Sequence, residues 1–140
     1  MTSSPGCWAC FGEILAREYS DLDYHEVHRL TVDTYAVQHP GTPSPQSIRS
    51  VALHGIRLCA ILERDLALRD ANEVMKQKAA VRSEFTWLTP PDSLGAITVL
   101  DVVKAANADE HSALVWSWAR SVWDAWSPHH DTFRAWLDRA

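Results

Sequence analysis

The histidines and cysteines are the side chains of this sequence best suited to chemistry. The chain of 140 residues holds seven His and three Cys. His28 and His54 lie in segments with the apolar spacing of helices, and His130 follows Pro128 near the C-terminal end. Three neutral imidazoles that leave one coordination position open suit a catalytic zinc or a similar divalent metal. His28, His54 and His130 are therefore the first candidate ligand set, with zinc as the expected ion.

A second set, Cys7, Cys10 and His39, is incompatible with the first. Cys7-Trp8-Ala9-Cys10 is a Cys-x-x-Cys motif, which supplies half of a tetrahedral zinc site, but the sequence has no second Cys pair. Counting across an antiparallel helix pair places both cysteines nearer His39 than His28. On one continuous helix His28 and His39 are roughly 16 Å apart, because each residue rises ~1.5 Å, so they cannot share a metal. The sequence leaves both sets open, beside the ordinary interpretation that each histidine is a hydrogen-bonded core residue.

The elements that must position these residues are all predicted to be helices. No segment alternates polar and apolar residues for long enough to form a sheet. The apolar spacing predicts helices over 11–19, 24–39, 47–69, 70–81, 99–106, 109–126 and from 128 onward, after a short polar lead at 1–10. We therefore predict a single all-α domain over residues 1–140, built as a bundle of six or seven helices.

The segment 24–39 and the segment 47–69 should pack against each other as antiparallel neighbours. The connection between them, residues 40–46, is short and rich in Pro, Gly and Ser. Counting outward from this turn places His54 at about the level of His28, which makes them the best convergent pair. Gly55 costs roughly 1 kcal/mol in a helix interior, so we expect a helix or a large side chain to approach it closely.

Two polar residues are expected to face water or to cap a helix. Asp33 falls on the side of segment 24–39 opposite the apolar stripe, where it should pair with Arg29 for a few tenths of a kcal/mol. His111 stands one turn into the predicted helix 109–126, so we interpret it as a surface or capping histidine.

Seven tryptophans are many for a chain of this length, and five lie between residues 116 and 136. The favoured interpretation is that they are core anchors, since each can bury roughly 150–250 Å². The alternative is an aromatic-lined binding face, with Tyr35, Trp123 and Trp126 as its candidate residues.

Several segments resemble a bacterial family of small proteins classed only as a domain of unknown function. The matching segments, in order along nearly the whole chain, are SPGCW, HRLTVDTYAVQHPG, SVALHGIRLCAILER and WARSVWDAWSPHH. Many members of that family carry a further Cys-x-x-Cys before SPGCW, which this sequence lacks, so a metal site using that segment would be missing. The resemblance implies no activity.

Composition excludes several classes of function. The net charge is −5 with no basic block, which disfavours binding to a nucleic-acid backbone. No apolar run approaches the ~20 residues of a membrane span. The first residues lack the basic and apolar regions of a signal peptide, and three cysteines without one indicate free thiols in a reducing cytoplasm.

Two functions remain as hypotheses. The first is a divalent-metal-binding bundle with a histidine-lined site. In its more specific form this hypothesis makes the protein a metalloenzyme that acts on a small molecule. The second is a non-catalytic ligand-binding or protein-interaction module that uses the Trp-rich C-terminal face, including self-association into a homo-oligomer. The sequence has no Gly-x-Ser-x-Gly, phosphate-binding Gly loop or His-Glu-x-x-His motif, so it names no reaction.

Overall fold

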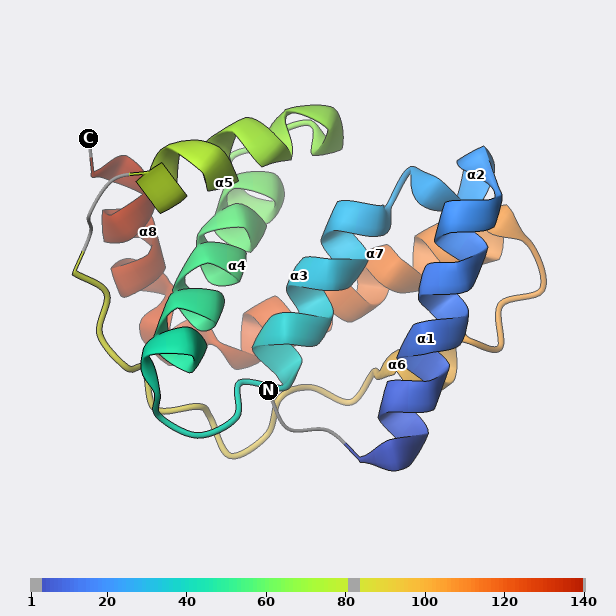
Figure 1. The fold of residues 1–140 in the computed structure, drawn as a ribbon, viewed down its shortest axis with the longest axis horizontal. Helices are drawn as coiled ribbons and strands as arrows, with labels where there is room; N and C mark the ends of the chain where they lie inside the picture. The colour runs from blue at the N-terminus through green and yellow to red at the C-terminus, as the bar shows by residue number, and fades with distance from the viewer. Residues whose placement is uncertain (1–3, 81–83, 140) are drawn as a thin grey trace.

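The chain forms a bundle of helices, as the sequence predicts. The computed structural model describes residues 4–80 and 84–139, and within these ranges there are eight α-helices and no strand (Figure 1). The α-helices are α1 (Pro5–Ser20), α2 (Leu22–His25), α3 (His28–Gln38), α4 (Pro45–Glu63), α5 (Ala71–Ala80), α6 (Val99–Val102), α7 (Ala108–Ala125) and α8 (His130–Asp138). Two 3₁₀ turns, η1 (Leu68–Asp70) and η2 (Ser127–His129), precede α5 and α8. None of the helices in these ranges is long and apolar enough to cross a membrane.

Helices α3 and α7 occupy the middle of the molecule. Helix α4 packs against α3 on one side and against α5 and α8 on the other, while α1 lies at the opposite end with α2 and α6 (Figure 1). The molecule therefore has an α4 side and an α1 side, joined through α3 and α7.

Helix α1 begins earlier than the sequence predicts. Residues 1–10 were expected to be a polar lead, yet the helix starts at Pro5, which suits the first helical turn because it needs no N–H partner there. Ser4 caps this end, since its Oγ accepts a hydrogen bond from the backbone N–H of Cys7 at 3.2 Å. Cys7 and Cys10 consequently belong to the first turns of α1 rather than to a loop.

The predicted helix 24–39 is divided into two helices. Residues 26–27 form a turn between α2 and α3, and Val27 leaves helical geometry with φ −97° and ψ 9°. The predicted helix 47–69 ends early, at Glu63, and Asp65 then adopts a left-handed φ of 52°. The predicted helix 70–81 corresponds to η1 and α5, with residue 81 outside the described residues.

The helix starts in the last third follow the predicted capping chemistry closely. Thr98 and Asp101 form the expected capping box at the start of α6, although α6 ends at Val102 and not at 106. The cap of α7 is Asn107, whose Oδ1 accepts from the N–H of Glu110 at 2.9 Å, rather than Asp109. Pro128 lies in the first turn of η2, which leads into α8.

Four of the five tryptophans of the C-terminal third lie in the core, and Trp116 is partly buried. Trp118 and Trp126 are fully buried, and Trp123 and Trp136 are 5% exposed. Gly55 packs against Phe133, as the expected close approach requires. An added Cβ at Gly55 would lie 2.1 Å from the Cε1 atom of Phe133, which leaves no room for a side chain.

Gln38, the last residue of α3, holds a long loop in place. Its Nε2 donates to the carbonyl oxygens of Leu94 at 3.1 Å and Ile97 at 2.8 Å. Its Oε1 accepts from the indole Nε1–H of Trp118 at 2.8 Å. One amide therefore joins α3, the loop before α6 and α7.

Candidate functional site

The centre of the candidate site is Glu18, a carboxylate with no solvent exposure. Its Oε1 lies 2.9 Å from Nδ1 of His28, and its Oε2 accepts from Thr31 Oγ1 at 2.6 Å and lies 2.8 Å from Nε2 of His111. Burying an ionised carboxylate is costly unless it is hydrogen-bonded, and these three partners from α3 and α7 meet that requirement.

Glu18 is a residue that the sequence analysis missed. It follows Phe11 and Ile14 on the buried face of α1, at helical spacings of three and four residues. An ionisable residue that continues an apolar stripe in this way is the signal that could have found it. Tyr19 was expected to point inward instead, but it is 70% exposed.

His25 and His28 form a stacked pair of imidazoles, which we call the imidazole pair. Their ring centroids are 5.0 Å apart and their planes differ by 13°. Nδ1 of His25 lies 2.9 Å from the backbone carbonyl oxygen of Glu18, which can only accept, so this nitrogen carries the hydrogen. Nδ1 of His28 donates to the Glu18 carboxylate in the same way. Both rings, when neutral, therefore carry their lone pair on Nε2, and neither Nε2 has a hydrogen-bond partner among residues 4–80 and 84–139.

His111 is buried in the same network and does not lie at the surface as predicted. Its side chain has no exposure, and the edge of its ring contacts Tyr24 at a centroid distance of 5.0 Å. The Nδ1 atom of His111 is buried and finds no partner within the described part of the chain. The prediction was wrong because α2, which brings Tyr24 over α7, was not foreseen as a separate element.

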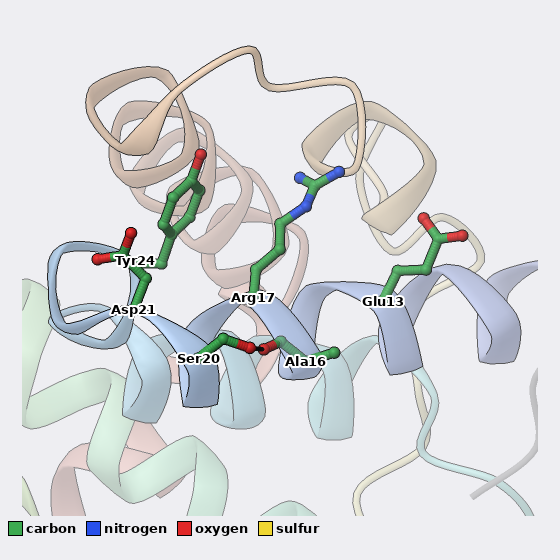
Figure 2. Close-up of a pocket in the computed structure, with 6 residues that line it drawn as sticks. All are labelled: Glu13, Ala16, Arg17, Ser20, Asp21 and Tyr24. Atoms are coloured by element: carbon green, nitrogen blue, oxygen red, sulfur yellow. Dashed lines mark hydrogen bonds between the residues drawn. The ribbon is translucent and has the colours of Figure 1, made fainter.

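Three cavities surround the α1–α2 corner, next to Glu18. The first, the Arg17 cavity, has a volume of about 470 Å³ and is drawn in Figure 2. The second, the histidine cavity, has about 210 Å³ and includes Glu18 and His25 in its lining. The third, the arginine cavity, has about 490 Å³ and is lined by His25, Arg29, Arg69 and Trp116 among others. His25 lines both the histidine cavity and the arginine cavity, and His28 stacks on His25.

The Arg17 cavity has a different chemical character. Figure 2 shows the side chains of Arg17 and Tyr24 rising from α1 and α2 on the same side, with Glu13 and Asp21 at either end. The Nη2 of Arg17 donates to the carbonyl of Val103 at 2.6 Å. Two carboxylates face one guanidinium here, so this cavity does not favour an anion.

A second buried carboxylate, Asp33, lies between α3 and α4. Its two oxygens accept from Nε of Arg57 at 2.9 and 2.7 Å, and its Oδ1 lies 2.7 Å from Nδ1 of His54. Asp33 has no exposure, so the prediction that it faces water and pairs with Arg29 was wrong. It failed because the side of α3 opposite the His28 stripe packs against α4 and is not free.

The structure separates the members of the first predicted ligand set. His28 bonds Glu18, whereas His54 bonds Asp33. The predicted helix pairing placed His54 opposite His28, which is five residues before Asp33 in α3. His130 stacks on Trp123 at 3.9 Å, and its Nε2 lies 2.7 Å from the carbonyl oxygen of the same residue.

The alternative ligand set is likewise not assembled into a metal site among the described residues. Nδ1 of His39 lies 2.9 Å from the carbonyl of Tyr35, and burial lowers the pKa of His39. Cys7 and Cys10 are partly buried free thiols of α1. Among the described residues no group of three or more His, Cys, Asp or Glu side chains is arranged to hold a metal ion. Zinc binding stays a prediction.

The predicted binding residues Tyr35, Trp123 and Trp126 are core residues. Tyr35 is fully buried and stacks on Phe11 at 3.8 Å, and the Nε1–H of Trp126 donates to the carbonyl of Val37 at 3.0 Å. They support the core-anchor interpretation of the aromatic residues rather than an exposed binding face.

The third cysteine, Cys59, is buried and chemically inert. Burial raises the pKa of its thiol to about 12, and the neighbouring Glu63 carboxylate adds to this shift. The thiolate needed for nucleophilic or metal chemistry is therefore absent near neutral pH.

The fold and the site define an all-α protein with a buried carboxylate–imidazole network. The chain belongs to the family described as "Family of unknown function (DUF5946)", whose model matches residues 1–127. This confirms the resemblance to a domain of unknown function. Neither the curated proteins nor the solved structures give a match to the chain.

Proposed function

We propose that the protein is a small-molecule enzyme in which the imidazole pair performs general acid–base catalysis. The observation that carries the proposal is that one residue, Glu18, holds Nδ1 of both His25 and His28, at 2.9 Å in each case. Fixing Nδ1 fixes the tautomer and turns both Nε2 lone pairs away from Glu18.

The surroundings of the pair suit proton transfer to a bound molecule. His25 is exposed and lines two cavities, and the His28 side chain retains 16% exposure between the rings of His25 and Tyr19. A neutral imidazole takes a proton on Nε2, and the imidazolium formed on His28 is stabilised by the Glu18 carboxylate at its other nitrogen. Two such rings side by side provide one base and one acid.

A divalent metal held by the same Nε2 atoms is the second candidate. Histidines that bind metals usually donate their other ring N–H to a carboxylate or a backbone carbonyl. These are the partners of Nδ1 in His28 and His25. The candidate keeps the predicted divalent metal but replaces the predicted ligands His54 and His130 with His25.

The test uses hydrolysis of p-nitrophenyl acetate. Water attacks the ester carbonyl as Nε2 accepts its proton, and the acyl C–O bond then breaks to release p-nitrophenolate and acetic acid. We expect the wild-type protein to exceed the buffer rate, and His28→Ala to lose roughly 10²-fold, the lower range for general-base catalysis. His129→Ala is the matched control, because the Nε2 of His129 already bonds the carbonyl of Thr89.

The outcome is decided by folded variants. If His25→Ala and His28→Ala give wild-type circular dichroism and wild-type rates, acid–base catalysis by the pair is refuted. Addition of zinc and of a chelator separates the two candidates, since only the metal candidate predicts a rate that follows the zinc concentration.

A further inference from the structure

We infer that the arginine cavity binds the phosphate or carboxylate group of a small substrate beside the imidazole pair. This names the substrate class of the site and rests on the proposed function. The cavity lies where the turn between α2 and α3 meets the segment after α4 and the middle of α7.

The charge of this cavity is opposite to that of the whole chain. Arg29 and Arg69 carry permanent positive charges, and His25 adds a third when protonated, against the single carboxylate of Glu26. The chain as a whole has a net charge of −5. A local excess of positive charge in an acidic protein attracts anions to this cavity in particular.

The two guanidinium groups have donors to offer. Arg29 makes one long hydrogen bond, from Nη1 to the carbonyl of Leu68 at 3.4 Å. Arg69 is exposed, and it has no hydrogen bond or ion pair with any residue in 4–80 or 84–139. Each guanidinium has five N–H donors in a planar fork that matches the two oxygens of a carboxylate or phosphate. Most of these donors are available to a ligand.

Trp116 provides an apolar wall in the same cavity. Its side chain is partly buried, and the guanidinium of Arg120 lies 5.8 Å from its ring centroid. A flat organic group attached to the anion can pack on this wall, as ligand sites combine apolar surface with a few polar anchors. We therefore expect a phenyl-bearing anion to bind more tightly than inorganic phosphate.

His25 connects this cavity to the proposed chemistry. Because it lines both the arginine cavity and the histidine cavity, an anion held by Arg29 and Arg69 lies next to His25, the outer ring of the imidazole pair. Substrate and base are then neighbours, which is the requirement for proton transfer to or from a bound molecule.

The test is isothermal titration calorimetry with inorganic phosphate and with phenyl phosphate on the full chain at low ionic strength. We expect saturable binding of both, tighter for phenyl phosphate. Arg29→Gln and Arg69→Gln should each weaken binding roughly tenfold or more, as expected for loss of a charge-assisted hydrogen bond. Arg49→Gln, which removes the same charge from a different cavity, should change the Kd by less than about twofold.

The results separate this inference from the proposed function. Absence of saturable binding, or Arg69→Gln binding both probes like the wild type, would overturn the anion site. Arg69 is exposed, so its variant tests the site even if Arg29→Gln unfolds. Binding that depends on both arginines, together with a His28→Ala variant that hydrolyses p-nitrophenyl acetate normally, would retain the anion site and reject the catalytic role of the pair.

Discussion

Glu18 and Asp33 are both fully buried, and each bonds Nδ1 of one histidine, but their remaining partners differ. Asp33 is paired through both oxygens with the guanidinium of Arg57, which is charged at every accessible pH. Within the described part of the chain Glu18 has no such cation. Its partners are a threonine hydroxyl and two imidazoles, which carry charge only when they are protonated.

This difference separates a structural ion pair from a candidate site. The charge balance around Asp33 is fixed once the chain has folded. Around Glu18 the hydrogen-bond partners that the structure describes are groups without a permanent charge. The α1–α2 corner beside Glu18 also borders the Arg17, histidine and arginine cavities.

The largest effect is expected from Asp33→Asn, because it leaves the Arg57 guanidinium buried without its anion. Removing one partner of a buried ion pair costs about 3–5 kcal/mol. Urea unfolding followed by circular dichroism measures the loss. Asp131→Asn is the control, since Asp131 is exposed and its pair with Arg134 should contribute under about 1 kcal/mol. Equal losses in the two variants would contradict the assignment of Asp33 to a structural pair.

Gly55→Leu should destabilise the α4 side by overpacking, by about 1–3 kcal/mol. The added side chain has no space against Phe133, which is itself buried. Gly12→Leu in α1 is the matched control, because nothing lies within 4 Å of an added Cβ there. Thermal unfolding of both variants measures the two losses of stability. If Gly55→Leu has no effect on stability, α8 can move away from α4 at little cost and the overpacking argument is wrong.

Glu18→Gln should cost less than Asp33→Asn, about 1–3 kcal/mol, because the partners left behind are imidazoles that can stay neutral. In Glu18→Gln an amide NH₂ replaces one carboxylate oxygen, so one of the N–H or O–H groups that donate to Glu18 loses its acceptor. The comparison is best made by urea unfolding at pH 8, where exposed imidazoles are neutral. A loss as large as that of Asp33→Asn would show that Glu18 is also a permanently charged pair.

His28→Ala and His54→Ala should have additive effects on the free energy of unfolding. The two rings bond different carboxylates on different helices, so their coupling energy should be within about 0.5 kcal/mol. A double-mutant cycle, run with and without zinc, measures it. Strong coupling that appears only with zinc would restore the predicted shared metal site.

The smallest effect concerns Glu63, which connects α4 to α8 at the surface. Hydrogen bonds from Arg134 lower the pKa of Glu63 below its ordinary value of 4.5. A lowered pKa in the folded state stabilises the protein above pH 4.5, and this stabilisation is lost as the pH falls through the folded pKa. The partly exposed pair should contribute well under 1 kcal/mol, visible as a slightly weaker acid dependence of unfolding in Glu63→Gln.

The sequence predicted the fold class because helix signals are local. The Thr98–Asp101 capping box, the helix start at Pro128 and the approach of a large residue to Gly55 all follow from residue types within one or two turns. The break at 26–27 was missed because neither Glu26 nor Val27 is a helix breaker. The turn is determined instead by what α2 and α3 each pack against.

The candidate site was only partly predicted, because it depends on contacts between distant segments. The sequence analysis named His28 as a candidate, but its partner Glu18 and the buried His111 lie on two other helices. Counting outward from the turn, residues 39–44, placed His54 opposite His28. In the structure His54 lies opposite Asp33 instead. The count failed because it assumed that the turn is shared equally between α3 and α4. An error of this size changes which side chains meet, even where the two helices are correctly predicted to pack against each other.

The amide of Gln38 also has a consequence for the order in which the chain folds. Its bonds reach Leu94, Ile97 and Trp118, which are 56, 59 and 80 residues away in the sequence. Contacts of such separation require a large loop to close, so they form after the local helices in folding. We therefore expect residues 84–98 to take their final position late in folding, after α3 and α7 have met, when Gln38 and His129 bond the carbonyl groups of this segment.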